Sequence, residues 1–247
     1  MLAASEQRPA APFTVLHREG LVHGFLLLRT PEGETIATGE LTQGARGDRV
    51  TSKVVFHFKD GSLHEETVIF SQRDRFRLLS YHLTQKGPAF KHPTMELTIN
   101  GANGDATARY TDDDGKQKEA SDHFNLPPNL ANGMIATLLK NAPPGVTPLE
   151  ASLIAATPKP RLVKMVITPA GQDSFSIATS KREATKYVVK VQIGGVAGAV
   201  APLVGKQPPD THVWILGGDA PTFVKSEGPL YEGGPIWRIE LVSPSWP

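Results

Sequence analysis

The segment VTSKVVFHFKDGSLHEETVIF, residues 50–70, decides the fold class. Two runs rich in β-branched and aromatic residues flank Asp60-Gly61, a dipeptide that favours the tight turn of a β-hairpin. We therefore expect antiparallel strands over residues 50–58 and 63–70. A hairpin of this kind, with further short strands on both sides of it, is typical of an all-β protein.

Further strand patterns lie on both sides of this hairpin, separated by turns rich in Gly, Asn and Asp. Near the C-terminus, Trp237, Ile239 and Leu241 alternate with Arg238 and Glu240, which is typical of an antiparallel strand with one wet face. The polar segment 116–124 is expected near an edge of the sheet. The further predicted strands are 75–83, 95–99, 105–111, 116–124, 162–168, 174–180, 186–193, 211–216, 222–226 and 236–242.

The period of the pattern changes in the middle of the chain. Leu130, Met134 and Leu138 recur at helical spacing after Pro127-Pro128, and they predict a helix over about 130–139. Thr147-Pro148-Leu149-Glu150 has the residues of a capping box and predicts a second helix that ends at Pro158. We therefore expect a mainly β protein: a large curved antiparallel sheet, or half-open barrel, with two short helices packed on its concave face.

The domain organisation follows from this pattern. Residues 1–12 are expected to be a disordered polar lead-in, and residues 13–247 a single β-rich domain. The Pro-rich stretch 141–145 could instead divide two domains. A single sheet is favoured because neither half alone has a second layer to cover its apolar face.

Composition excludes several classes of protein. The 247 residues carry a net charge of +1 and no Cys, which excludes disulfide scaffolds and thiolate metal sites and argues against a nucleic-acid binder. No apolar run reaches the length of a membrane span, so we expect no transmembrane segment. Residues 1–12 lack the apolar region of a signal peptide, and Leu2-Ala3-Ala4-Ser5 is either an ordinary start or a stub left after cleavage.

The hairpin also carries the one candidate metal site. A two-residue turn would place His57 opposite His64, with Cβ atoms about 4.5–5.5 Å apart, and Glu66 on the same face. Imidazole and carboxylate groups are zinc ligands. A solvated histidine pair is the alternative, and a three-residue loop would break this register. No nucleophile elbow, phosphate loop or dinucleotide motif occurs, so no cofactor is expected.

Candidate contacts for an apolar ligand come from two regions. Large aromatic residues of the last third either fill the core or line a cavity. The uncharged segment 194–205 packs against backbone or covers an apolar cavity. The candidate contacts are Trp214, Phe223 and Trp237, together with Leu130 and Met134 of the first predicted helix.

Several stretches together resemble a known group of proteins. They are Asp60-Gly61-Ser62, Gly87-Pro88, 126–139, 194–206 with Pro208-Pro209-Asp210, 228–231 and 234–238. The set resembles uncharacterised bacterial exported proteins related to the lipoprotein-localisation-factor (LolA-like) fold. The resemblance implies a half-open antiparallel barrel with helices on its concave face, a periplasmic setting and an apolar ligand such as an acyl chain.

Three functions are therefore considered. The first is a periplasmic or otherwise exported binding protein that holds an apolar small molecule or lipid. The second is an envelope scaffold that presents its Pro/Gly-rich loops to a protein partner. The third is a metal-dependent hydrolase that uses His57 and His64.

Overall fold

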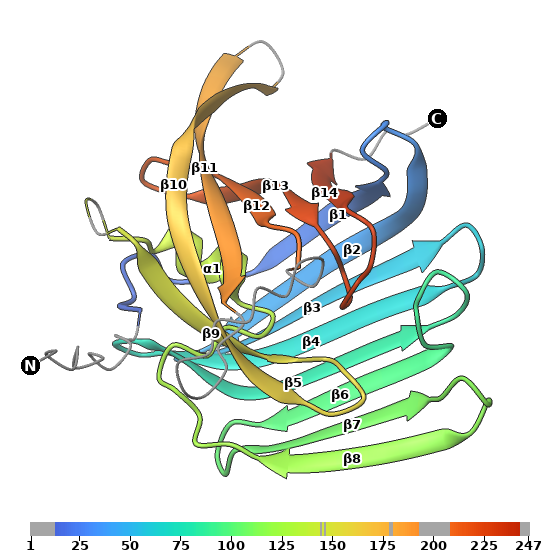
Figure 1. The fold of residues 1–247 in the computed structure, drawn as a ribbon. Helices are drawn as coiled ribbons and strands as arrows, with labels where there is room; N and C mark the ends of the chain where they lie inside the picture. Colours follow the sequence, from blue (N-terminus) through green and yellow to red (C-terminus); the bar gives the residue numbers. More distant parts are fainter. Residues whose placement is uncertain (1–12, 144, 146, 178–179, 193–207, 243–247) are drawn as a thin grey trace, which may run out of the picture.

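The computed structural model describes residues 13–143, 145, 147–177, 180–192 and 208–242. Within them, fourteen strands form one antiparallel sheet (Figure 1). The predicted lead-in 1–12 and the segment 194–205 lie outside the described residues. The strands are β1 (Val22–Arg29), β2 (Thr35–Arg46), β3 (Arg49–Phe58), β4 (Leu63–Gln72), β5 (Phe76–Lys86), β6 (Thr94–Asn100), β7 (Asp105–Thr111), β8 (Gln117–His123), β9 (Leu149–Ala155), β10 (Arg161–Ile177), β11 (Ser180–Gln192), β12 (Thr211–Leu216), β13 (Thr222–Gly228) and β14 (Trp237–Val242).

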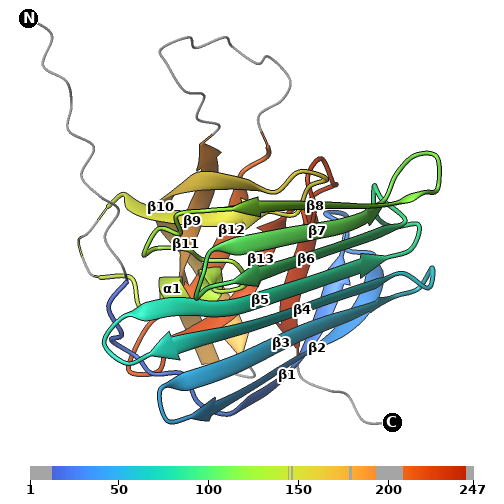
Figure 2. The same ribbon diagram turned by 90° about the horizontal axis from the view of Figure 1, so that it is seen from below.

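The order of strands explains the shape. The sheet runs β8-β7-β6-β5-β4-β3-β2-β1-β14-β13-β12-β11-β10-β9, so the first half of the chain meets the second where β1 pairs with β14. The sheet curves until its two halves face each other across the short helix α1 (Ile135–Lys140) (Figure 2). In the described part of the chain, β8 and β9 each have one strand neighbour, so the sheet is not closed into a barrel. The predicted edge position of the polar strand β8 is confirmed.

The prediction of two helices is wrong, because only α1 forms among the described residues, and it begins at Ile135 rather than near Leu130. The segment expected to be the second helix is the strand β9. Only nine residues separate Pro148 from Pro158, which is too short for an independently stable helix. As a strand, the same residues pair along Arg161–Ile167 of β10 and satisfy their backbone there.

The predicted register of the first hairpin is also wrong. The amide of Phe58 donates to the carbonyl of Ser62 at 2.9 Å, which leaves a three-residue loop with Gly61 at a φ of +85°. His64 therefore pairs with Phe56, and His57 pairs with Leu63. A slip of one residue moves a side chain to the other face of the sheet, so His57 and His64 point to opposite faces.

The strands β1 and β2 have no counterpart among the predicted strands. The sequence of β2 alternates small and apolar inward residues, Ala37, Gly39 and Leu41, with Thr38 and Glu40. Gly39 is required by a close approach, because a Cβ there would lie 2.5 Å from the ring of Phe56. Small residues at two of these three inward positions weaken the alternation that identifies a strand in a sequence.

The inner face of the sheet carries two groups of buried apolar residues. The plug-side cluster joins residues of β3–β7 to residues of β9–β12 through Leu130, Met134, Leu138 and Leu139. The aromatic cluster lies at the other end of the interior and comprises Leu26, Leu28, Ala37, Phe56, Phe58, Phe90 and Trp237. No helix in the described ranges has the length and hydropathy needed to cross a membrane.

Candidate functional site

A segment that belongs to no strand fills the space between the two halves of the sheet. We call residues 126–142 the plug; it contains α1 and the turns before it. Leu130, Met134, Leu138 and Leu139 are all buried, and they contact both halves of the sheet within the plug-side cluster. The apolar inner faces of the two halves are thus joined by an inserted segment of the chain.

The plug also covers the open edge of β9. The amide of Ala131 donates to the carbonyl of Ser152 at 2.7 Å, and the amide of Ser152 donates to the carbonyl of Asn129 at 3.1 Å. The side chain of Asn132 pairs with both backbone groups of Ile154 at 2.9 Å. These bonds satisfy backbone groups that a strand neighbour would otherwise satisfy.

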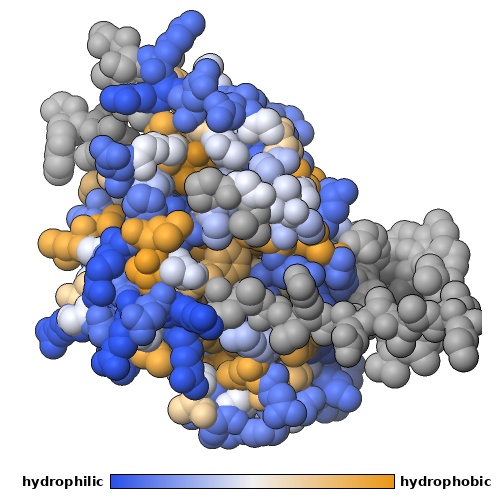
Figure 3. All heavy atoms as spheres, turned by 90° about the vertical axis from the view of Figure 1, so that its left-hand side faces the viewer, coloured by the Kyte–Doolittle hydropathy of each residue, from blue (hydrophilic) through white to orange (hydrophobic). Residues whose placement is uncertain are grey.

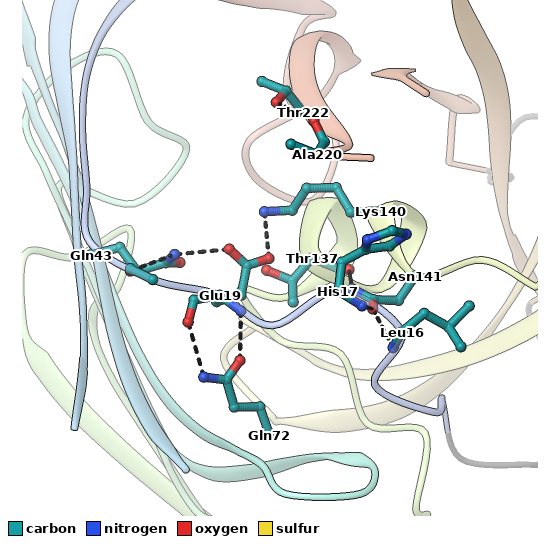
Figure 4. Close-up of polar contacts among 11 residues, drawn as sticks. Leu16, His17, Glu19, Gln43, Gln72, Thr137, Lys140, Asn141, Ala220 and Thr222 are labelled. Atoms are coloured by element: carbon teal, nitrogen blue, oxygen red, sulfur yellow. Dashed lines mark hydrogen bonds and ion pairs between the residues drawn. The ribbon is translucent and has the colours of Figure 1, made fainter. Parts of the chain in front are cut away.

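An ion pair holds the C-terminal end of α1 (Figure 4). The ammonium group of Lys140 contacts the carboxylate of Glu19, which also accepts a hydrogen bond of 2.9 Å from Gln43 of β2. Gln72 of β4 accepts from the amide of Glu19 at 2.6 Å and donates to its carbonyl at 3.0 Å. We call the contacts among Glu19, Lys140, Gln43 and Gln72 the latch, because they tie the plug to the inner face of the sheet.

Asn141 extends this polar network to the segment before β1. Its side-chain oxygen accepts from the amides of Leu16 and His17 at 2.8 and 2.6 Å, and its amide donates to the carbonyl of Thr137 at 2.9 Å. Asn141 is almost completely buried. A buried side chain with all its polar groups paired fixes the end of α1 and the path of residues 16–19 together.

A cleft of about 350 Å³ opens beside the latch. Figure 3 shows the side of the molecule that is on the left in Figure 1, where hydrophobic patches are separated by hydrophilic residues. A second, much smaller hollow of about 10 Å³ lies beside Gln85 and Tyr231, and the exposed residues Lys91 and Glu232 are part of its lining. The cleft is lined by Leu16, His17, Arg18, Glu19, Lys140, Asp219, Ala220 and Pro221.

Gly133 allows the plug to lie directly on the sheet. Its φ is +68°, and a Cβ there would lie 3.0 Å from the Cβ of Val68 and 3.3 Å from the ring of Tyr81. Any other residue would meet both a backbone penalty and a crowded contact. A substitution at Gly133 is therefore a test of how closely the plug approaches β4 and β5.

The structure separates the predicted ligand contacts into three places. Leu130 and Met134 lie in the plug, and Phe223 packs against the same cluster from β13. Trp237 lies in the aromatic cluster, with its ring centroid 5.5 Å from that of Phe58. Trp214 lies on the other face of β12 from the core residues Val213 and Ile215.

Trp214 is buried on the outer face by polar neighbours. Its indole donates to Asp173 at 2.6 Å, and the ammonium groups of Lys225 and Lys186 lie 4.1 and 5.2 Å from its ring centroid. The register pairs Trp214 with both lysines. This residue is therefore outside the site formed by the plug and the inner face.

The candidate metal ligands are not brought together. His57 is on the outer face, while His64 is buried on the inner face, where burial lowers the pKa of its imidazole to about 4. The side chain of Gln85 hydrogen-bonds the Nδ1 of His64 at 3.1 Å. Across the residues that the structure describes, no three His, Cys, Asp or Glu side chains are grouped as metal ligands would be.

Glu66 is the acidic residue of the inner face that contacts the plug region. Its carboxylate accepts a hydrogen bond of 2.7 Å from the hydroxyl of Tyr81, which also hydrogen-bonds the side chain of Asn132 in the plug. Burial raises the pKa of Glu66, and burial together with this carboxylate raises the pKa of Tyr81 well above its usual range. The sequence marked Glu66 as a metal ligand, but Tyr81 and Asn132 were missed, because the register of β4 with β5 and the position of the plug bring these residues together.

Comparisons with known proteins show the fold. The chain is similar to the crystal structure of a β-barrel-like protein of the domain of unknown function DUF1849 from Brucella abortus, with a TM-score of 0.52 and 11% identity over 92% of this chain and 97% of that chain. A protein with a YmcC-like fold from Bacteroides fragilis aligns with a TM-score of 0.35 and 10% identity, over 94% of this chain and 98% of that chain. No protein-family model and no curated protein matches the sequence.

Proposed function

We propose that the protein is an exported binding protein that takes an apolar, lipid-like ligand into the half-open barrel, in the space that the plug occupies. The observation that carries the proposal is the plug itself. Its buried residues Leu130, Met134 and Leu138 fill the interior but belong to no strand. An apolar ligand could replace these contacts with little change in the buried apolar area.

The way the plug is held supports this exchange. Besides its apolar contacts, it is tied to the sheet by two backbone hydrogen bonds to Ser152, by the side chain of Asn132 and by the ion pair of Glu19 with Lys140. Water can replace these polar contacts when the plug moves. With the plug in place the interior is filled, because its buried side chains pack with those of both halves of the sheet in one cluster. Binding in the interior therefore requires the plug to move.

The cleft beside the latch is the proposed entrance. Its volume of about 350 Å³ is that of a small ligand site, and Leu16, Ala220 and Pro221 give it apolar surface next to Lys140. Leu130, Met134 and Phe223 are the proposed ligand contacts, and Trp237 would meet the far end of a long chain. The exported, periplasmic location and the relation to the lipoprotein-localisation factors are supported by the sequence resemblance. We do not propose a metal-dependent hydrolase, because His57 and His64 lie on opposite faces.

Native mass spectrometry of the purified protein, before and after denaturation, tests the proposal. We expect an adduct of lipid mass that is lost on denaturation. In parallel, the apolar fluorescent probe N-phenyl-1-naphthylamine should bind the apo protein and be displaced by the extracted lipid.

Two glycine variants make the test specific to the plug. Gly133→Ala pushes the plug away from Val68 and Tyr81 and should increase probe affinity several-fold. Gly115→Ala is the matched control, because its φ is +76° and nothing lies within 4 Å of the added Cβ. The absence of any adduct, with no probe binding by the wild type or by Gly133→Ala, would overturn the proposal.

A further inference from the structure

One acidic side chain interrupts an apolar row across the inner face. The pairing of adjacent strands aligns eight residues, one from each of β1–β8: Gly24, Leu41, Val54, Glu66, Leu83, Leu97, Ala108 and Ala120. Residues aligned in this way share one face of the sheet. Seven of the eight are apolar or lack a side chain, so the carboxylate of Glu66 is the one polar group in the row.

Glu66 differs in burial from its neighbours along β4. His64 and Val68, the inward residues on either side of it along β4, are buried, whereas Glu66, together with its row neighbours Val54 and Leu41, is only partly buried. One carboxylate oxygen accepts from Tyr81 at 2.7 Å. Within the described ranges, the second oxygen has no hydrogen-bond partner, so it can accept one from a ligand.

No cation neutralises this carboxylate. The nearest basic side chain along the strand, His64, is uncharged at neutral pH because burial lowers its pKa to about 4. No ion pair to Glu66 occurs among the described residues, in contrast to Glu65, which pairs with Lys53 at 2.9 Å on the outer face. When the carboxyl group of Glu66 is ionised, a second anion beside it meets a like charge that no cation screens, in a region of low dielectric constant.

The plug blocks this group when it is in place. Asn132 of the plug hydrogen-bonds Tyr81, and Gly133 lies against the ring of the same tyrosine. Movement of the plug therefore removes Asn132 and leaves the Tyr81–Glu66 pair facing the vacated apolar space. A polar group with a free acceptor in an apolar cavity orients a ligand by its polar end.

We propose that Glu66 and Tyr81 form the head-group site of the cavity, and that they select apolar chains whose polar end is a non-anionic hydrogen-bond donor, such as a hydroxyl or ammonium group, and reject carboxylates and phosphates. This inference rests on the proposed function. It narrows the ligand class from any apolar molecule to long-chain alcohols and amines, and molecules with the same kind of end group.

The test compares ligands of one chain length. Dodecanol, dodecylamine and dodecanoate are used to displace N-phenyl-1-naphthylamine from the full-length protein at pH 7.5. We expect the alcohol and the amine to bind at least about tenfold more tightly than the carboxylate, because the repulsion between two like charges lowers affinity by at least about tenfold. In Glu66→Gln the carboxylate should bind as well as the alcohol.

The matched control is Glu65→Gln, the adjacent residue on the outer face of the same strand, which should leave the order of affinities unchanged. Tyr81→Phe keeps the packing of the ring and should reduce the preference by removing the hydroxyl that orients Glu66. Equal displacement by the three ligands in the wild type, or an order that Glu66→Gln does not change, would overturn the head-group site. Failure of all three ligands to displace the probe, or of the probe to bind, would instead count against the proposed function.

Discussion

The two ends of the interior are filled in different ways. In the aromatic cluster, Phe58 lies with its ring centroid 5.4 Å from that of Phe90 and 5.5 Å from that of Trp237, and Tyr231 completes the contacts. Phe58 and Trp237 are strand residues of the sheet itself. At the other end, apolar side chains of the plug lie between those of β3–β7 and β9–β12, and the plug is held by polar contacts that involve Glu19, Gln43, Asn132 and Asn141.

This difference indicates which end is a fixed core and which can change. Aromatic rings that project from paired strands can leave only if the sheet itself comes apart. Under the proposed function the plug moves aside instead. Its polar contacts are then exchanged for water and its apolar contacts are replaced by the ligand, while no ladder of β1–β8 depends on it. The aromatic cluster would then set the stability of the sheet, and the plug-side cluster would set access to its interior.

The largest expected effect is the loss of a ring from the aromatic cluster. Phe56 is completely buried between Gly39 and His64, so Phe56→Ala should lower the free energy of unfolding by about 3–5 kcal/mol. Denaturant unfolding measures this change. Probe affinity of the folded fraction should change less than it does in Met134→Ala, because Phe56 belongs to the aromatic cluster and not to the cluster that contains the plug.

Met134→Ala is the comparison at the other end. Met134 is also completely buried, but its deletion should cost less than Phe56→Ala and should increase probe affinity, because the plug can readjust. An equal loss of stability from the two substitutions, with no gain in probe affinity from Met134→Ala, would show that the two ends do not differ.

The next largest effect on stability is expected from a substitution in the latch. Lys140→Met leaves the buried carboxylate of Glu19 with Gln43 as its side-chain partner, and it should cost about 2–3 kcal/mol, somewhat less than a fully buried pair because Lys140 is partly exposed. The double variant Glu19→Gln, Lys140→Met removes the unpaired charge and should regain part of that loss. Both should increase probe affinity; a double variant as unstable as Lys140→Met would contradict the role of the ion pair.

The strands were predictable where inward residues are large and alternate. The hairpin around Asp60-Gly61 and the strand with Trp237 and Ile239 have such patterns, and both form. The segment from Leu149 to Ala155 was expected to be helical because local capping signals say nothing about a partner strand. Antiparallel pairing with the next strand, β10, overrides that local preference.

The site was less predictable than the fold. Glu66 was expected to be a metal ligand beside His64 and His57, but the position of His57 depended on a register that one extra loop residue changes. Trp214 alternates correctly in its strand, yet sequence alone does not say which face is inside. The latch could not be foreseen. Its residues Glu19, Gln43, Gln72 and Lys140 are brought together only when the sheet has curved around the plug.

The pH dependence of stability sharpens the comparison at the border of the aromatic cluster. The imidazole of His64 has a pKa of about 4 in the folded protein and about 6.5 when unfolded, so the unfolded state binds the proton first. The contribution of the neutral imidazole to the free energy of unfolding is complete above pH 6.5 and is lost as the pH falls towards 4. The free energy of unfolding should decrease by about 2 kcal/mol between pH 7 and pH 5. Unfolding at both pH values should show this difference reduced in His64→Asn; an unchanged difference would mean that His64 is accessible to protons in the folded state.

The smallest expected effect separates the inner face from the outer. Trp214→Phe removes the hydrogen bond to Asp173 and weakens the contact with Lys225, which should cost about 1 kcal/mol. Probe affinity should stay the same, because Trp214 and the plug are on opposite sides of the sheet. Phe223→Ala, on the inner face of the neighbouring strand, should change probe affinity. If Trp214→Phe alters probe affinity and Phe223→Ala does not, the ligand binds the outer face, and the plug is part of a permanent core.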